Sequence, residues 1–233
     1  MTELRFGLTA PMPCSYLPDQ QEQLVFLLPE QPLDASLYQQ LLQLNFRRSA
    51  EQVYTPHCPS CQACQSVRIA PEHFIPSRSQ RRLLNKAVRL GWQYQLDNDT
   101  SGDYYPLFAD YISTKHADGS MYPPAPEQLD GMIRCSWLSV RLLKQFYQGE
   151  LVAVSIVDET DDALSAVYTF YQPAVSQFSP GILAILFLLQ AAMQRQKKWL
   201  YLGYQIDACQ KMAYKAAFLP QQRFIQGQWR SFG

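Results

Sequence analysis

The feature that most limits the fold is a change of hydrophobic period at residues 137–171. Three runs rich in β-branched and aromatic residues follow one another there, at 137–147, 151–157 and 164–171, and short polar turns separate them. Such runs are typical of β-strands joined by tight turns, so the sequence predicts an antiparallel meander. The turn at 158–162 carries four acids, which we interpret as a solvated hairpin tip and not as a metal site.

Helical and extended segments alternate around this meander. After it we expect a buried helix at 182–196, a strand at 199–203, a helix near 209–218 and terminal β-like residues at 223–229. Before it we expect paired strands at 4–9 and 23–28, helices at 33–49, 77–90 and 104–115, and a strand at 66–69.

The order of these elements predicts an α/β (α+β) protein. Its mixed sheet, flanked by helices, resembles that of the acetyltransferase (GNAT-type) superfamily. The polar segment 97–103 is the best domain boundary in the chain. It divides an N-terminal, cysteine-bearing subdomain at 1–96 from a second subdomain at 104–233.

Composition places the chain among ordinary globular proteins. It has 233 residues, 47% of them hydrophobic, which is enough for a sizeable core. The first residues do not resemble a secretory signal, and the longest apolar run, 182–189, is far shorter than the roughly 20 residues that span a bilayer. We therefore expect a cytoplasmic, monomeric protein with reduced thiols and no membrane segment. Basic and acidic residues number 20 each, so any contact with nucleic acid would depend on local clusters of charge.

Three cysteines, Cys58, Cys61 and Cys64, are each separated from the next by two residues. This spacing lets a turning backbone aim several sulfurs at one point, as metal and cluster sites require. Cys14, in a proline-rich loop, is our candidate for the fourth ligand. Two interpretations stay open: a structural zinc ion or iron–sulfur cluster, or reduced thiols that only pack.

The helix expected at 77–90 carries charge of one sign. Its basic residues share one face: Arg78, Arg82, Lys86 and Arg89. Its apolar residues share the opposite face: Leu83, Leu84, Ala87, Val88 and Leu90. A solvated face usually mixes charges of both signs, so the pattern favours contact with an anion such as a phosphate backbone. The alternative is a soluble helix whose charges are balanced by acids on neighbouring elements.

The start of the buried helix bears on the acyl donor. Enzymes that use acyl-CoA hold its pyrophosphate with a glycine-rich turn, whose backbone N–H groups bind phosphate. This chain has Ser179-Pro180-Gly181, with one glycine and a proline that has no N–H to give. The segment disfavours CoA, whereas a donor held by its polynucleotide body would not need such a turn.

Motifs along nearly the whole chain resemble one known family. They are 14–18, 46–49, 54–64, 67–68, 74, 77–82, 165–171, 201–204, Cys209, Lys211, Met212, Tyr214, Lys215 and Phe218. With them the chain resembles the bacterial leucyltransferases of the arginyl-tRNA protein transferase family. The resemblance implies transfer of leucine from leucyl-tRNA to proteins that begin with aspartate or glutamate, which marks them for degradation by the N-end rule pathway. It implies no cofactor for the transfer itself.

The same resemblance suggests roles for particular side chains. Cations that would bind the acidic protein substrate are Arg78, Arg81, Lys115, Lys211 and Lys215. Cations that would bind tRNA phosphates are Arg82, Lys86 and Arg89. Aromatic residues that would contact the donor or acceptor are Phe170 and Tyr201. Catalytic candidates are Tyr168, Tyr204 and His116, the last as a proton relay.

Three other functions are compatible with parts of the pattern. One is the same reaction with arginyl-tRNA as donor. Another is a CoA-dependent N-acetyltransferase, which the Ser179-Pro180-Gly181 turn disfavours. The third is a non-enzymatic, metal-stabilised RNA-binding module, which would bind tRNA whether or not it is aminoacylated.

Overall fold

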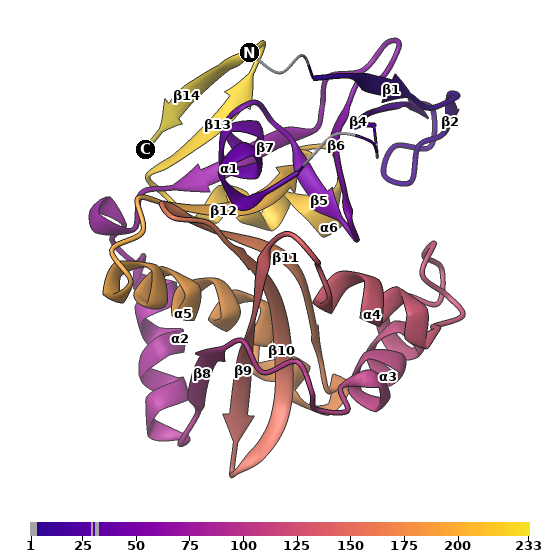
Figure 1. Ribbon diagram of the computed structural model, residues 1–233. Helices are drawn as coiled ribbons and strands as arrows, with labels where there is room; N and C mark the ends of the chain where they lie inside the picture. The colour runs from indigo at the N-terminus through magenta and orange to yellow at the C-terminus, as the bar shows by residue number, and fades with distance from the viewer. Residues whose placement is uncertain (1–3, 29, 31–32) are drawn as a thin grey trace.

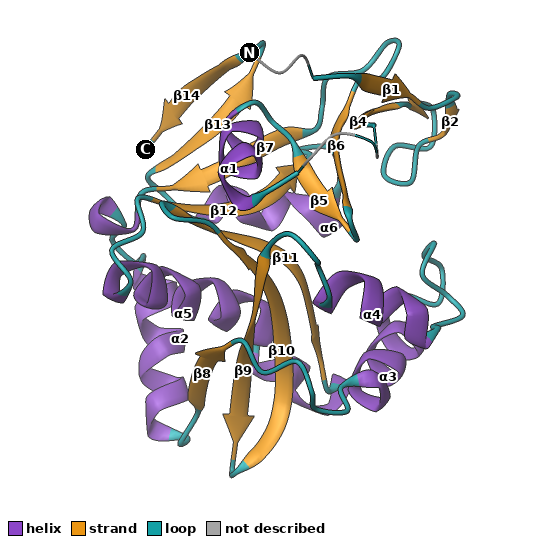
Figure 2. Cartoon of the chain, in the orientation of Figure 1, coloured by secondary structure: helices purple, strands orange, loops and turns teal. Residues whose placement is uncertain are grey.

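A large mixed sheet with helices on both faces forms the body of the protein (Figure 2). The computed structural model describes residues 4–28, 30 and 33–233. The sheet has eight strands in the order β14-β13-β7-β12-β11-β10-β9-β8 (Figure 1). Their bounds are β7 (Gln65–Ile69), β8 (Gln93–Asp97), β9 (Ser139–Tyr147), β10 (Glu150–Glu159), β11 (Ala163–Tyr171), β12 (Trp199–Gln205), β13 (Gln221–Ile225) and β14 (Gln228–Phe232). The predicted α/β class is confirmed.

The predicted meander is formed by β9, β10 and β11, which pair antiparallel in sequence order. The connection to β12 is different, because β11 and β12 run parallel. A parallel pair needs a crossover, and helix α5 (Pro180–Gln194) provides it. Helix α5 is apolar on nearly every side and largely buried, as the sequence predicts.

Two pairs of helices cover the two faces of this sheet (Figure 1). Helices α5 and α2 (Arg78–Arg89) pack on one face, with Leu183 and Ala87 in the same apolar cluster. Helices α3 (Tyr105–Lys115) and α4 (Pro126–Ile133) pack on the other, where Phe108 and Leu129 meet the strands. The short helix α6 (Gln210–Ala213) and the 3₁₀ turn η3 (Tyr214–Ala217) follow β12 and contact it.

The N-terminal residues form a smaller sheet of four strands in the order β1-β4-β6-β5. Its elements and the neighbouring helix are β1 (Phe6–Leu8), β4 (Leu24–Leu27), β5 (Arg47–Ser49), β6 (Gln52–Pro56) and α1 (Ala35–Gln43). The predicted pairing of the first two segments is confirmed, since β1 and β4 are antiparallel. The loop between them carries Cys14 and a short ladder of β2 (Met12–Pro13) and β3 (Gln21–Glu22).

Some predicted boundaries are wrong. The helix expected at 33–49 ends at Gln43, because Asn45 adopts a left-handed conformation (φ 75°) and Arg47–Ser49 become strand β5. The single terminal strand expected near 223–229 is a hairpin of β13 and β14, which turns at Gly227. Helix α4 and strand β8 carry no strong periodic pattern, and the sequence analysis missed both.

The prediction of a solvated tip at 158–162 holds for exposed Asp161 but not for Asp158 and Glu159. Asp158 is buried and forms an ion pair with Arg48, with 2.7 Å between Oδ1 and Nη2, while the Tyr38 hydroxyl donates to its other oxygen at 2.9 Å. Glu159 is largely buried and pairs with Arg141 and Lys197. The prediction was wrong because the cations that receive these carboxylates lie far away in the sequence.

The large sheet includes strands from both sides of the expected boundary at 97–103. Strands β7 and β8 precede it, yet β7 lies between β13 and β12, and β8 pairs with β9. The division into residues 1–96 and 104–233 stays a prediction. In the described part of the chain, no helix has the length and apolar character that crossing a membrane requires.

Candidate functional site

The central strands β11 and β12 separate part-way along their length. They pair only from Ala163–Trp199 to Ser165–Tyr201, after which β11 continues beside β10 and β12 continues beside β7. Gly203 lies at this divergence with a positive φ of 77°, and a Cβ there would be 4.0 Å from the Ala166 carbonyl oxygen. Helix α6 and turn η3 follow directly. Residues from several elements therefore meet where the sheet opens.

Two of the predicted catalytic residues lie on either side of one tyrosine. Tyr111 on α3 contacts Tyr168 on β11, with 6.4 Å between ring centroids, and its hydroxyl lies 3.1 Å from Nε2 of His116. Burial raises the pKa of Tyr168 to about 12, with a contribution from nearby Tyr16. The hydroxyls are therefore neutral at pH 7 and can donate or relay a proton. The sequence analysis placed Tyr111 in the packed stripe of its helix and missed this contact.

Three charged side chains surround His116. Lys211 on α6 and Asp118 in the turn after α3 form an exposed ion pair, with 2.9 Å between Nζ and Oδ2. Burial lowers the pKa of His116 below its usual 6.5, the positive charges of Lys211 and Lys115 lower it further, and Asp118 opposes them. Neutral imidazole is thus the main form at pH 7 and can accept a proton. Lys115, Lys211 and His116 thus lie in one region, and their roles at a substrate site stay a prediction.

Lys215 on η3 differs from the other predicted substrate cations because it is buried, with 5% of its surface exposed. Its ammonium group donates to the Tyr204 carbonyl at 2.8 Å and contacts the Met212 sulfur at 3.7 Å. Burial lowers its pKa from 10.5 to about 8, an effect that Cys209 partly opposes. Burying an ammonium group without a carboxylate partner lowers the free energy of unfolding. The hydrogen bond from Lys215 to β12 is therefore made at a cost in stability.

Tyr204 is tied to the N-terminal sheet. Its hydroxyl donates to the Asn45 carbonyl at 2.7 Å, and its ring lies beside Tyr54 and under the Arg47 guanidinium. Burial raises the pKa of Tyr204 well above 10, so the hydroxyl keeps its proton. This bond connects strand β12 to the end of α1. A catalytic role for Tyr204 stays a prediction.

Two predicted contact residues are core residues instead. Phe170 has 0% of its surface exposed and packs edge-on against Phe108, with 5.6 Å between ring centroids. Tyr201 has 1% exposed and packs against Trp229. Each strand presents alternate residues to opposite faces. Phe170 faces an apolar layer, whereas the Tyr201 ring lies under the Arg47 guanidinium, with 4.9 Å between Cζ and the ring centroid. Their predicted contact with substrate is corrected.

Helix α2 has the one-sign surface that the sequence predicts. Ser77 caps its start through a reciprocal pair of hydrogen bonds with Gln80. Its basic side chains are all exposed: Arg78, Arg81, Arg82, Lys86 and Arg89. Among the described residues no carboxylate forms an ion pair with any of them. The alternative of charges balanced by neighbouring acids therefore finds no support in the described structure.

A surface hollow of about 720 Å³ lies on the same helix. Its lining residues are Arg82, Asn85, Lys86, Val88 and Arg89. Val88 is 74% exposed, so its predicted place on the apolar face is wrong. The three cations predicted to bind tRNA are thus brought to one hollow, while Arg78 and Arg81 lie nearer the start of the helix.

The four predicted metal ligands lie near one another. Burial, followed by the charges of Cys58, Cys14 and Cys61, raises the pKa of the Cys64 thiol to about 12. All six cysteines are free. Even so, no group of three or more histidine, cysteine or acidic side chains in the described ranges is arranged to hold a metal ion. A metal or cluster site at these thiols stays a prediction.

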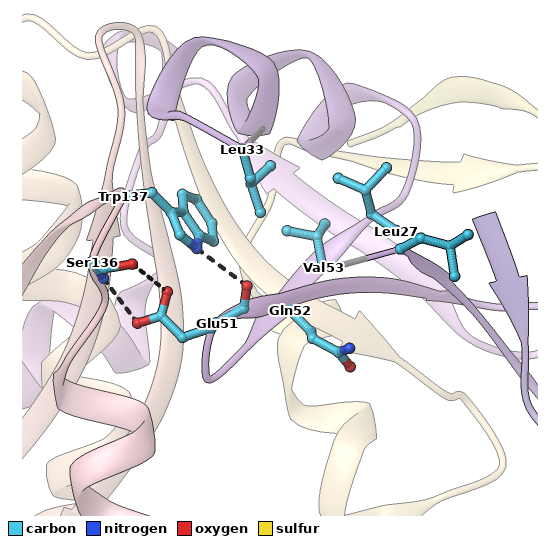
Figure 3. Close-up of a pocket in the computed structure, with 8 residues that line it drawn as sticks. Leu27, Leu33, Glu51, Gln52, Val53, Ser136 and Trp137 are labelled. Atoms are coloured by element: carbon cyan, nitrogen blue, oxygen red, sulfur yellow. Dashed lines mark hydrogen bonds between the residues drawn. The ribbon is translucent and has the colours of Figure 1, made fainter. Parts of the chain in front are cut away.

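A second hollow, of about 560 Å³, lies between the small sheet and the start of β9 (Figure 3). Glu51 accepts hydrogen bonds from the backbone and hydroxyl of Ser136 at 2.9 and 2.8 Å, and the Trp137 indole donates to the Glu51 carbonyl. Leu28 and Leu33 line the hollow, and residues 29, 31 and 32 between them lie outside the described part of the chain. Glu51, Ser136 and Trp137 bond to one another, and we assign the hollow no ligand.

Comparison with known proteins identifies the family. Residues 12–82 match the family model "Arginine-tRNA-protein transferase, N terminus", and residues 103–225 match "Arginine-tRNA-protein transferase, C terminus". The chain belongs to the arginine-tRNA-protein transferase family. The part that matches the C-terminal model contains His116, Lys211 and the point where β11 and β12 separate. The part that matches the N-terminal model contains the start of α2 and the four predicted metal ligands, Cys14, Cys58, Cys61 and Cys64.

Relatives within the family are similar over their whole length. The aspartate/glutamate leucyltransferase of Aeromonas hydrophila is 44% identical over 99% of this chain and 98% of the relative. The protein of the same name from Aeromonas salmonicida is 45% identical over the same shares. That of Vibrio cholerae is 43% identical over 98% of this chain and 97% of the relative. Among solved structures, L-PGS from Bacillus licheniformis has a TM-score of 0.47 at 12% identity. The match covers 63% of this chain and 48% of that one, and the likeness is distant.

Proposed function

We propose that the protein is an aminoacyltransferase that moves leucine from leucyl-tRNA to the N-terminal α-amine of proteins beginning with aspartate or glutamate. The product would carry a destabilising first residue and enter N-end rule degradation. One observation carries the proposal: relatives 38% to 45% identical over nearly the full chain share the name aspartate/glutamate leucyltransferase.

The chemistry asks mainly for positioning. An amine displaces an ester, so the reaction runs downhill and needs two aligned substrates and one proton acceptor. The α-amine has a reference pKa near 8, so a weak base is sufficient. His116, neutral at pH 7 and in contact with the Tyr111 hydroxyl, is the proposed acceptor of that proton. Tyr168 would face the reacting groups from β11.

The acidic first residue calls for fixed cations near this base. Lys211 and Lys115 are exposed and close enough to His116 to lower its pKa. Lys211 already forms an ion pair with a carboxylate, that of Asp118, which supports an acid-binding role. Arg78 and Arg81, on helix α2, are then assigned to the tRNA body together with Arg82, Lys86 and Arg89.

Helix α2 would hold the donor by its phosphates. Its unpaired cations and its hollow suit a backbone of repeated negative charge. The start of α5 supports the choice of a tRNA over CoA, because Pro180 has no N–H and the Ile182 and Leu183 N–H groups both donate to the Ser179 carbonyl. We further propose the GNAT-type acyltransferase fold, on the strength of the antiparallel meander, the crossover helix and the diverging β11 and β12.

The experiment that tests the proposal is transfer of radiolabelled leucine from leucyl-tRNA to peptides that differ only in the first residue: aspartate, glutamate, lysine or alanine. Label confined to the two acidic peptides is the expected result. Label from arginyl-tRNA instead would change the donor, and labelled acetyl transfer from acetyl-CoA would change the reaction class. Binding of tRNA without any transfer would favour an RNA-binding module and overturn the proposal.

No cofactor is needed for this reaction, and we propose a monomer acting in the cytoplasm on leucyl-tRNA and acidic-N-terminus proteins. A structural zinc ion or iron–sulfur cluster at Cys14, Cys58, Cys61 and Cys64 would stiffen the loop before α2 and take no part in the transfer. Elemental and sulfide analysis of anaerobically purified protein tests it, and protein free of both zinc and iron would remove it.

A further inference from the structure

An exposed ion pair joins two distant segments beside His116. Lys211 and Asp118 are 93 residues apart in sequence, and their side chains are 60% and 72% exposed. Among the described residues, the other lysine or arginine ion pair with two well-exposed side chains is Asp130–Arg134, whose residues are four apart at the end of α4. The Lys211–Asp118 pair crosses from α6 to the turn after α3, and both partners face solvent.

The pair lies at the proposed reaction site. The charges of Lys211 and Asp118 act on the pKa of His116 in opposite directions, and Lys115 adds a second positive charge. The His116 ring in turn contacts Tyr111, which lies beside Tyr168. A carboxylate bound to Lys211 is therefore held within reach of the groups that would receive the α-amine.

Asp118 offers Lys211 the same chemical group as an aspartate at the start of a protein. Resting on the proposed transfer reaction, we propose that the Asp118 carboxylate occupies Lys211 in the absence of substrate and that the acidic side chain of the incoming protein displaces it. The exchange replaces one carboxylate by another, so Lys211 is never left without a counter-charge. An exposed ion pair contributes little stability, so the exchange costs little.

Lys211 supplies the selectivity for acids in this scheme, and Asp118 sets how tightly an acidic substrate binds. A first residue without a carboxylate gains nothing from Lys211, and a lysine at that position meets Lys211 and Lys115 as like charges. Asp118 competes with the acidic side chain for Lys211 and therefore raises KM for acidic substrates. It touches neither the leucyl ester nor the α-amine.

The test is steady-state leucyl transfer to peptides beginning with aspartate or alanine, at pH 8, where His116 is neutral with or without Asp118. Asp118→Asn should lower KM for the acidic peptide about 1.5-fold to 5-fold without lowering kcat, as loss of a competing exposed pair predicts. Lys211→Met should raise that KM. The double variant should match Lys211→Met, since Asp118 acts only through Lys211. Asp130→Asn, which breaks an equally exposed pair elsewhere, should leave both constants unchanged.

An unchanged or raised KM in Asp118→Asn, with a melting temperature equal to that of the wild type, would overturn the inference while leaving the proposed function intact. So would a lower KM in the double variant than in Lys211→Met. A wild-type protein that labels no acidic peptide would overturn both, and the two failures are therefore distinguishable.

Discussion

Replacing Lys215 with methionine should stabilise the fold at neutral pH. Lys215 has 5% of its surface exposed, and the hydrogen-bond partners of its ammonium group are a carbonyl and a thioether. Burial lowers its pKa from 10.5 to about 8. Because the unfolded chain holds this proton more tightly than the folded protein does, protonation favours unfolding. The cost is fully present below pH 8, shrinks as the pH rises from 8 to 10.5, and is absent above.

The expected size follows from the pKa shift. A shift of this size corresponds to about 3 kcal/mol at pH 7 and about 2 kcal/mol at pH 9. Methionine keeps the unbranched side chain and removes the charge, while loss of the hydrogen bond to the Tyr204 carbonyl offsets about 1 kcal/mol at every pH. The free energy of unfolding of Lys215→Met should therefore exceed that of the wild type by about 2 kcal/mol at pH 7, and by about 1 kcal/mol at pH 9.

Urea unfolding of both proteins at pH 7 and pH 9 measures the difference in the free energy of unfolding. Groups that the two proteins share titrate in the same way in both, so their contributions cancel in this difference. Lys211→Met is the matched control, because Lys211 is exposed and its removal should change stability little at either pH. A Lys215→Met advantage that is equal at the two pH values, or a variant less stable than the wild type at both, would refute the reasoning.

Three further predictions concern other parts of the molecule. Asp158→Asn should lower the free energy of unfolding, measured with urea, by about 3–5 kcal/mol, because it leaves the buried Arg48 guanidinium without its carboxylate. The control is Asp161→Asn at an exposed position, and an equal loss in the two variants would contradict the argument. Glutamine at Arg82, Lys86 and Arg89 together should weaken tRNA binding and reduce the slope of log affinity against log salt by about 3, with an unchanged slope as the contrary result. His116→Gln should reduce kcat about 100-fold or more and remove the protonation of His116 from the pH profile, which leaves only the fall in rate that protonation of the α-amine causes below about pH 8; a variant that keeps the wild-type profile would exclude His116 as the base.

Local sequence patterns predicted the elements whose residues bury one face or all faces. The meander β9–β11, helix α5 and helix α2 have strong periods, and the structure contains them within a few residues of the expected bounds. Helix α4 begins with proline and is eight residues long, so its period is too short to recognise. The end of α1 depends on Asn45, whose carbonyl accepts from Tyr204 on a strand 159 residues later, and no local pattern carries that information.

In the candidate site, too, local spacing predicts some features and only the fold determines the others. Exposure of the α2 cations follows from helical spacing alone, so the sequence could place them. Burial of Phe170, Tyr201 and Asp158 depends on which sheet face another element covers, and only the fold determines this. The contact of His116 with Tyr111 depends on how the chain turns after α3, and the effect of the Lys211 charge on the His116 pKa depends on a segment that follows β12.

The basic helix and the proposed acid-binding lysine are linked through η3. Near the start of α2, Gln80 donates to the Ala217 carbonyl at 3.1 Å, and Phe74 stacks on Phe218. At the other end of the same turn, Lys215 holds the Tyr204 carbonyl of β12. Because α6, which carries Lys211, continues directly into η3, the surface proposed for the donor and the cation proposed for the acceptor belong to one continuous set of contacts. Their separation is thus set by one short segment of the chain, which bears on a reaction that depends on aligning two large substrates.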